Sequence, residues 1–491
     1  MGAQRADELR QGPARAERPR LARRRSGPLP RRAGRRAGVI DALETAERAV
    51  AAAEADEAEA VVLAERSGFA RFAGSEVHQP TLVEDVSVSL RLVVDGRVGV
   101  AATNDLADEG LRRLARRAAE SAASAPAEES FPGLAEPAPL PTVSGYDADT
   151  AALEPDDQAR LAAAAIDAAT LPTYGYFTSG VTRVAVVSSH GVRAEQTLTD
   201  ATALVLTAGD ETSGYAELTS WRAGEVDPAA VAREAEETAR RTHGARPLEP
   251  GPYAAVLERY ALAELLLYFS YDSLGALGLL EERGYFTGRL GERVFDPRIS
   301  IADDALDPAG LPKAFDFEGV PKRRVDLVEA GVARGVVWDR ETAARAGDGH
   351  VSTGHSPAPL EREWGPLPTA LSVAGGEAAS PEELAGLVGD GIYVTRLHYL
   401  SVVDPREGVI TGMTRDGTFR IRNGRLAEPL VNLRFTVSVP KLLSEVPGLT
   451  REPIVTNLND FYGARYPFGV LAPALATAHF NVTGTGSGPG I

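Results

Sequence analysis

The chain has 491 residues, which is enough for two or three domains with a substantial hydrophobic core. It contains no cysteine, which excludes disulfides and thiolate metal sites, and it has no run of about 18 apolar residues that would predict a transmembrane helix. The net charge of −17 argues against a nucleic-acid-binding body, and the composition fits the reducing cytoplasm, where we expect the protein to reside.

The first 38 residues differ from the rest of the chain. They hold 12 arginines against three acidic residues, are rich in Pro and Gly, and lack periodicity, so residues 1–38 are predicted to be a disordered tail. Paired arginines superficially suggest an export signal, but an acidic amphipathic segment follows instead of an apolar one, so we reject export. We hypothesise that the natural chain starts near Val39. N-terminal sequencing of the natural protein tests this, and a native chain that begins at Met1 would contradict it. A tail that binds nucleic acid or an acidic partner is the alternative.

Residues 39–245 are predicted to form an α+β domain of hairpins packed by helices. Val86–Val94 alternates apolar and polar residues, as a half-buried strand does, and Asp95-Gly96 is a strong two-residue turn signal before a return strand. Helices are expected at Ile40–Ala58, Asp108–Ala125, Asp156–Ala169 and Pro228–Thr242, and further strands at Ala60–Ala64, Gly180–Ser188, Val192–Leu198 and Ala201–Ala208.

The composition changes at Arg246–Pro252, where we place the domain boundary. After an initial strand and a helix, residues 246–491 consist mainly of strand and turn signals, such as Asp416-Gly417 and Asn423-Gly424. This half is therefore predicted to be β-rich, with a strongly curved or barrel-like antiparallel sheet.

The helix near the start of this half has two distinct faces. Leu262, Leu265, Leu266 and Phe269 recur at helical spacing on one side, whereas the polar residues Glu264, Tyr268 and Asp272 form a line on the other. The polar line is either a solvated side or one that points into a cavity. Glu264 and Asp272 lie roughly 12 Å apart along the axis, too far to share a proton or an ion.

Several segments, in order, resemble the TldD/PmbA family of zinc-metallopeptidase-related proteins. They are RFAGSEVHQ (Arg71–Gln79), VSVSLRLVVDGRVGVAATND (Val86–Asp105), GYFTGRLGERVFDPRISIADD (Gly284–Asp304), DRETAARAGDGHVSTGH (Asp339–His355), the segment Gly391–Leu426 and NLRF (Asn432–Phe435). The resemblance covers the chain from about Ile40 onward.

In the catalytic branch of this family, a His-Glu-three residues-His motif precedes the third of these segments. A cysteine of the C-terminal domain in that branch looks like the third zinc ligand. Two imidazoles at this spacing bind zinc, and the glutamate acts as general base. The matching stretch here, Ala261–Leu277, has no histidine. The chain therefore resembles the PmbA/TldE branch. The resemblance implies a non-catalytic subunit with no cofactor of its own, in a heterodimer with a zinc-holding TldD-like partner. Such a subunit shapes a cavity for peptide substrates. From charge and hydropathy we expect neither nucleic acid nor a membrane as a partner.

Five residues are candidates for peptide or interface contacts: His355, Arg396, Thr414, Arg415 and Asp416. Two arginines on β-structure can hold a peptide carboxylate by paired hydrogen bonds, and the alternative is a structural salt-bridge cluster. No residue is predicted to be catalytic or to bind metal. Two other readings stay open. One is a peptidase with an atypical metal site that uses His350, His355 and a carboxylate, and the other is a non-enzymatic peptide-binding scaffold.

Overall fold

The computed structural model describes residues 41–127, 130–347, 349–458 and 464–486. These described residues belong to one compact unit. The expected tail at residues 1–38 lies outside the described residues, and the boundary at 246–252 stays a prediction. In the described part of the chain, no helix has both the length and the apolar character needed to cross a membrane.

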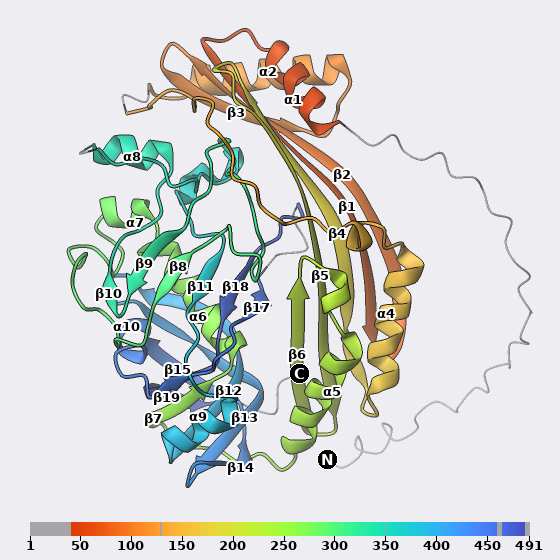
Figure 1. Ribbon diagram of the computed structural model, residues 1–491, viewed down its shortest axis with the longest axis vertical. Helices are drawn as coiled ribbons and strands as arrows, with labels where there is room; N and C mark the ends of the chain where they lie inside the picture. The colour runs from red at the N-terminus through yellow and green to blue at the C-terminus, as the bar shows by residue number, and fades with distance from the viewer. Residues whose placement is uncertain (1–40, 128–129, 348, 459–463, 487–491) are drawn as a thin grey trace, which may run out of the picture. The chain divides into compact units, whose positions relative to one another are not determined.

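A six-stranded antiparallel sheet fills the first half (Figure 1). Its strands lie in the order β3-β2-β1-β4-β5-β6 and are joined mostly by tight turns, such as Asp95-Gly96, where both residues have positive φ as the hairpin requires. The strands are β1 (Glu57–Ala73), β2 (Glu76–Val94), β3 (Arg97–Thr103), β4 (Thr173–Ser188), β5 (Arg193–Gly209) and β6 (Thr212–Ser220).

Alanine-rich helices cover one face of this sheet. Gly99 of β3 allows close packing because a Cβ there would lie 2.2 Å from the Ala118 carbonyl oxygen, and Gly214 of β6 plays the same role beneath Ala235. The helices are α1 (Ala42–Ala51), α2 (Asp108–Ser124), α4 (Pro155–Ala168) and α5 (Pro228–Arg241), with the short α3 (Ala148–Ala151) and η1 (Ala223–Glu225) beside them.

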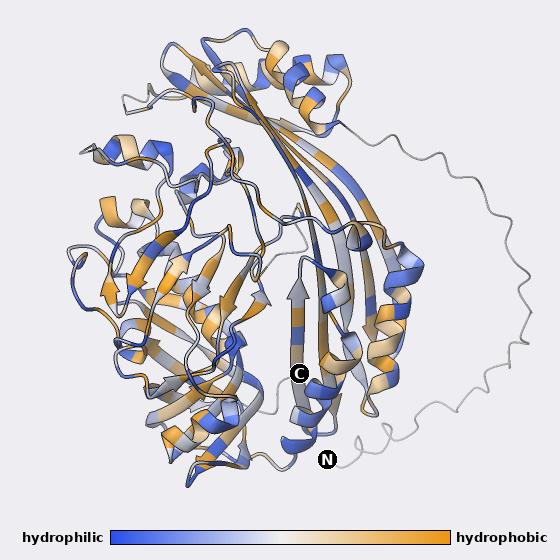
Figure 2. Ribbon diagram, in the orientation of Figure 1, coloured by the Kyte–Doolittle hydropathy of each residue, from blue (hydrophilic) through white to orange (hydrophobic). Residues whose placement is uncertain are grey.

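The other face packs against the second half of the chain. Val61 and Val186 point away from the helices and contact Phe315, whereas Val62, one residue on, faces α1 and α2. Figure 2 shows the resulting alternation of hydrophobic and hydrophilic residues along the long strands. Both faces of the sheet are therefore buried over much of its length.

The second half contains a ring of strands. A sheet in the order β12-β7-β19-β15-β13-β14 is closed by pairing of β12 with β13, and the β7–β12 pair is parallel. The strands are β7 (Gly251–Leu257), β12 (Gly391–Asp404), β13 (Val409–Arg422), β14 (Arg425–Leu430), β15 (Leu433–Ser438) and β19 (Leu475–Thr485), and β16 (Gly448–Leu449) pairs with β19.

A second, smaller sheet lies beside the ring, in the order β10-β9-β8-β11-β18-β17. Its strands are β8 (Ile301–Asp303), β9 (Val325–Glu329), β10 (Val332–Ala333), β11 (Leu371–Val373), β17 (Ile454–Asn457) and β18 (Gly469–Ala472). The helices of this half are α6 (Arg259–Ser273), α7 (Ala276–Leu280), α8 (Arg340–Ala346), η2 (Pro359–Trp364), α9 (Pro381–Val388) and α10 (Val439–Leu442). The apolar face of α6 contributes to the largest hydrophobic core.

The predicted α+β class with a barrel-like sheet is confirmed, but several element bounds were wrong. The first helix ends at Ala51 rather than Ala58, and the strand expected at Ala60–Ala64 is the 17-residue β1. The two strands expected within 192–208 are one strand, β5. It runs through the polar pair Thr199-Asp200 because Asp200 is buried against the guanidinium of Arg465, with Nη2 2.5 Å from Oδ2.

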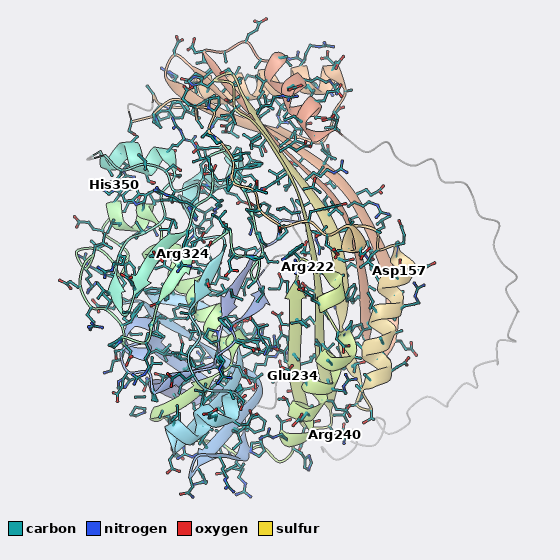
Figure 3. The ribbon with its side chains drawn as sticks, in the orientation of Figure 1. Asp157, Arg222, Glu234, Arg240, Arg324 and His350 are labelled. Atoms are coloured by element: carbon teal, nitrogen blue, oxygen red, sulfur yellow. The ribbon has the colours of Figure 1, made fainter. Side chains whose placement is uncertain are left out.

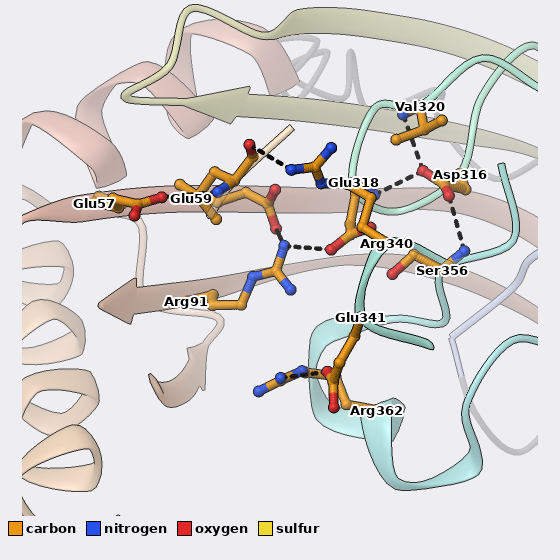
Figure 4. A network of polar contacts seen from close by, with 12 residues as sticks. Glu57, Glu59, Arg91, Asp316, Glu318, Val320, Arg340, Glu341, Ser356 and Arg362 are labelled. Carbon is orange, nitrogen blue, oxygen red and sulfur yellow. Dashed lines mark hydrogen bonds and ion pairs between the residues drawn. The ribbon is translucent and has the colours of Figure 1, made fainter. Parts of the chain in front are cut away.

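A buried ion cluster joins the first sheet to the second half (Figure 4). Arg91 Nη2 lies 2.8 Å from both Glu59 Oε1 and Glu318 Oε1, and its side chain is only 4% exposed. Asp316 lies nearby and accepts hydrogen bonds from three backbone N–H groups. We call Glu59, Arg91, Asp316 and Glu318 the Arg91 cluster. Burial raises the pKa of Glu59 and of Asp316 to about 7 each, and the neighbouring Glu318 acts in the same direction on both.

Candidate functional site

The polar side of α6 faces the ring strands and is only partly exposed. Glu264 projects from the middle of this side, and Tyr268 follows one turn later. Glu264 accepts a hydrogen bond from the backbone of Leu397, on β12, and interacts electrostatically with Arg396. Its second oxygen, Oε2, is buried and has no hydrogen-bond partner among the described residues. The polar line therefore points into the protein rather than into open solvent.

The β12–β13 hairpin places two arginines directly opposite each other. Arg396 pairs in register with Arg415, and the register shifts beside them, between Val394 and Arg396. Like charges at directly opposed positions are unfavourable, so a counter-charge is needed. Asp416 supplies it from a left-handed backbone conformation (φ +54°), which turns a residue adjacent to Arg415 toward the same guanidinium groups.

The two arginines use this counter-charge unequally. Arg396 donates from Nε to Asp416 Oδ2 at 2.7 Å, its Nη2 lies 2.5 Å from the same oxygen, and its guanidinium stacks 4.2 Å from the ring centre of Tyr215. Arg415 only approaches that oxygen, with Nε at 3.5 Å. Arg396 is therefore held by several contacts, whereas Arg415 has only the long contact with Asp416, although the two side chains are similarly exposed (19% and 21%). We call Glu264, Arg396, Arg415 and Asp416 the α6 cluster.

Burial governs the protonation of the acids around α6. It raises the pKa of Glu264 to about 8, with Glu217 acting in the same direction and Arg396 against it. It also raises the pKa of Glu217, on β6, to about 7, although Tyr215 and the Asn457 backbone donate hydrogen bonds to this carboxylate. Glu264 is thus mostly neutral at pH 7, as a carboxylic acid that can donate a hydrogen bond.

A cleft of about 230 Å³ adjoins this region. Tyr215 and Arg259 belong to its lining, together with Tyr260, whose hydroxyl donates to Glu234 Oε1 at 3.1 Å. Glu234 comes from α5 (Figure 3), so the cleft lies where the first sheet's helices meet the ring. Tyr215 links the cleft to the α6 cluster because its ring carries Arg396.

The structure separates the five predicted contact residues. Arg396, Arg415 and Asp416 come together. Thr414 is buried and is engaged elsewhere, because its hydroxyl accepts hydrogen bonds from the Thr418 hydroxyl and from the Leu433 backbone N–H.

His355 lies elsewhere, fully buried. Its Nε2 is 2.8 Å from Asp303 Oδ1 and its Nδ1 is 2.8 Å from the Thr353 hydroxyl. Burial lowers the pKa of His355 to about 4, so the neutral ring donates to an ionised Asp303. The Thr353 hydroxyl in turn contacts the Trp338 backbone, so this row has no free nucleophile and holds the loop in place.

Sequence reasoning missed Tyr215 and Glu217 because β6 was not predicted. The signal was present in the alternation of GYAEL, which places both residues on one face of a strand. The sequence predicted the polar line that contains Glu264. It did not predict the electrostatic partner of Glu264, Arg396, which lies 132 positions later.

The residues around α6 do not fit a zinc ion. Relative to Glu264, the only glutamate of α6, the motif's two imidazole positions fall at Ala263 and Tyr268. The positive charge that acts on Glu264 is the guanidinium of Arg396, which would repel a second cation. The ring centres of His350 and Trp338 lie 4.2 Å apart in a stacked pair. Figure 3 shows His350 far from Glu234, which lines the cleft. Across the described ranges, no group of three or more His, Asp or Glu side chains could hold a metal.

Three sequence models of one protein family match the chain. They describe the PmbA/TldA metallopeptidase domain 1 (residues 58–122), the central domain (146–242) and the C-terminal domain (250–484). The α6 cluster lies within the third match.

Individual relatives agree with this result. A metalloprotease of Methanothermobacter thermautotrophicus is 26% identical over 45% of this chain and 47% of that protein, and a metalloprotease TldD homolog of Haemophilus influenzae is 24% identical over 42% of each. The matches span about a quarter to a half of the length of the curated relatives. The crystal structure of TldE from Thermococcus kodakarensis superposes with a TM-score of 0.77 at 19% identity, covering 90% of this chain and 99% of that one, and so shares its fold.

Proposed function

Since this chain belongs to the PmbA/TldD metallopeptidase family, we propose that it acts as the TldE-like, non-catalytic subunit of a two-subunit peptidase in the cytoplasm. A TldD-like partner would supply zinc and the hydrolytic chemistry. This chain would shape the cavity that admits peptides and would stabilise its partner. The likeness to the TldE structure supports the assignment to this branch.

One observation carries the proposal: Glu264, the only glutamate of α6, interacts electrostatically with Arg396, and the two positions that the zinc motif would give to histidines are Ala263 and Tyr268. The positive charge of the guanidinium disfavours a second cation near Glu264, and neither motif position offers an imidazole, so we expect the helix to keep the frame of the family but not its zinc chemistry. Glu264, neutral at pH 7, is correspondingly a poor general base for activating water.

Metal content tests the proposal. The chain is purified alone and again after co-expression with a TldD-like partner, and zinc is measured by elemental analysis together with hydrolysis of a short unfolded peptide. We expect no stoichiometric zinc and no hydrolysis from the chain alone, and about one zinc per heterodimer with hydrolysis from the pair.

The matched control is a pair in which both motif histidines of the partner are replaced by alanine. This pair should still assemble but should lose both zinc and activity. Stoichiometric zinc in the chain alone, or hydrolysis by the pair carrying the altered partner, would contradict the assignment.

A further inference from the structure

The cleft of about 230 Å³ beside the α6 cluster continues into a second hollow of about 210 Å³. Glu258, Arg259 and Pro381 line both spaces, so the two adjoin at the start of α6 and of α9. The cleft is open to solvent, because the side chain of Glu234 in its wall is 49% exposed. Pockets that enclose drug-sized ligands measure roughly 300–1,000 Å³. The cleft is therefore suited to one side chain rather than to a large cofactor.

Buried aromatic side chains form the floor of the cleft. Tyr260, Tyr393 and Phe419 line it, and each is at most 5% exposed. Two arginines already stack on these rings, Arg259 at 4.2 Å from the ring centre of Tyr260 and Arg241 at 5.1 Å from that of Phe419. The floor therefore has the chemistry that attracts cations, because the face of an aromatic ring carries partial negative charge.

The acidic groups of the cleft outnumber its basic groups. Four glutamates line it against two arginines, namely Glu234, Glu237, Glu258 and Glu382 against Arg241 and Arg259. Glu234 approaches an arginine, with Oε1 3.6 Å from Arg259 Nη2. The side chains of Glu237 and Glu382 are exposed and have no ion pair or hydrogen bond with any residue that the structure describes. The surplus is two negative charges when Glu258 is ionised and still one when it is protonated, so it does not depend on that group.

Three of these carboxyl groups surround one space. Glu258, at the start of α6, accepts a hydrogen bond from the Tyr393 hydroxyl and interacts electrostatically with Glu234 of α5 and Glu382 of α9. Arg259 offsets part of the repulsion between them. Because all three glutamates line the same cleft, a cation placed in it would interact with each of them at once.

We propose that this cleft binds the basic side chain of a peptide, a lysine or an arginine, with Glu234, Glu258 and Glu382 around its positive charge. The inference rests on the proposed function only in taking the ligand to be a peptide. The aliphatic stem of the ligand side chain would lie against Pro381 and Leu426, which are half-buried in the cleft wall. This chain would thereby hold a substrate through one basic residue while hydrolysis takes place on the partner.

Binding of matched peptides to the chain alone tests this assignment. Three rhodamine-labelled peptides of one sequence, capped at both ends, carry lysine, norleucine or glutamate at one central position and are compared by fluorescence anisotropy at pH 7. We expect the lysine peptide to bind at least about fivefold more tightly than the norleucine peptide, the equivalent of one charged contact, and the glutamate peptide to bind most weakly. Equal affinities for lysine and norleucine would overturn the proposal.

Variants assign the preference to the cleft. Glu382→Lys places a cation beside Glu258 and should abolish the preference for lysine, whereas Glu382→Gln should only weaken it. Glu361→Lys is the matched control, because Glu361 is also an exposed glutamate in the first turn of a helix, η2, but does not line the cleft. The control corrects for the general attraction of a chain with a net charge of −17 for cationic peptides. Thermal unfolding shows that each variant is folded, and a preference that survives Glu382→Lys, or that falls equally with Glu361→Lys, would contradict the assignment.

Two further comparisons separate this site from a free-amine site and from the proposed function. Cadaverine, a free diamine, should displace the labelled lysine peptide only at much higher concentration than the unlabelled peptide does, and equal displacement would overturn the assignment to a peptide. Equal affinities for lysine and norleucine, together with zinc-dependent hydrolysis by the co-expressed pair, would reject this site alone and leave the proposed function standing. A preference for lysine without hydrolysis by the pair would reject the proposed function and support the cleft as a site for basic peptides.

Discussion

The Arg91 cluster and the α6 cluster are built from the same residue types, arginine, aspartate and glutamate, but the first has a surplus of acidic groups and the second a surplus of arginine. In the Arg91 cluster three buried carboxyl groups lie together and Arg91 contacts two of them, and burial with mutual repulsion raises the pKa of Glu59 and of Asp316 to about 7. In the α6 cluster two arginines share one carboxylate, and the nearby acid is mostly neutral. The first cluster is sealed between two parts of the chain, whereas the second opens to solvent.

The difference shows how burial decides what a charge imbalance does. A sealed surplus of carboxyl groups can be relieved only by protons, so it becomes a source of pH-dependent stability. A partly open surplus of arginine can be relieved by water and counter-ions from solvent. The same chemistry therefore gives a sealed joint in one place and a solvent-accessible cluster in the other.

The largest expected effect is the loss of Arg91. Arg91→Met removes the only cation of the Arg91 cluster and leaves Glu59 and Glu318 buried without a partner, so we expect the free energy of unfolding at pH 7.5 to fall by about 3–5 kcal/mol. Urea denaturation measures it. Arg112→Met, at an exposed pair on α2, is the control and should change little. A loss below about 1 kcal/mol for Arg91→Met would show that the carboxyl groups do not depend on the arginine.

The two arginines of the α6 cluster should differ sharply in stability. Arg396→Gln leaves the fully buried Asp416 without its closest partner and removes the stack on Tyr215, so we expect a loss of about 2–4 kcal/mol. Arg415→Gln should cost less than about 1 kcal/mol, because its contact with Asp416 is long, at 3.5 Å. The same denaturation experiment compares them. Equal losses would mean that Arg415 is as structural as Arg396.

Glu59→Gln tests the proton held by the Arg91 cluster. The pKa of Glu59 is about 7 in the folded chain and near 4.5 in the unfolded one, so the folded state binds the proton more tightly. Stability should therefore fall as pH rises from about 4.5 to about 7. Glutamine does not titrate, so we expect the variant to be more stable than the unaltered chain at pH 8 by about 1–3 kcal/mol and similar at pH 5. Parallel stability profiles from pH 5 to 8 would refute this view.

The smallest effect is expected for Glu264→Gln. Because Glu264 is mostly neutral at pH 7, the amide should reproduce its hydrogen bonding and change the free energy of unfolding by less than about 1 kcal/mol. Above pH 8 the variant should become the more stable protein, since the ionised carboxylate is destabilised by burial. Thermal unfolding at pH 7 and pH 9 is the measurement, and a large loss at pH 7 would indicate an ionised glutamate paired with Arg396.

The sequence predicted those parts of the fold whose pattern is local. Val86–Val94, the Asp95-Gly96 turn and the helix over Pro228–Arg241 follow from alternation, turn chemistry and helical spacing. It could not predict that β5 continues through Thr199-Asp200, because the partner that makes burial of Asp200 favourable is Arg465, far along the chain. Tertiary pairing there overrides the local preference for a break.

The candidate site was predictable to the same degree. Arg396, Arg415 and Asp416 were selected together from two neighbouring sequence runs, and the hairpin register brings them together. Which arginine is free depends on the left-handed backbone at Asp416 and on the ring of Tyr215, and neither leaves a mark in the local sequence. The position of His355 beside Asp303 likewise depends on a contact between distant segments.

The closed ring also sets an order of events during synthesis. The six strands of the first sheet are complete once residue 220 has left the ribosome, so that half can begin to fold early. Strand β7 is made soon afterwards, but both of its neighbours come much later, β12 from residue 391 and β19 from residue 475. Strand β7 ends at residue 257, so β12 begins 391 − 257 = 134 residues later and β19 begins 475 − 257 = 218 residues later. Until β19 is made, the hairpin that carries Arg396 and Arg415 cannot be locked into the closed ring. The face of the hairpin that carries both arginines is therefore among the last parts of the nascent chain to mature.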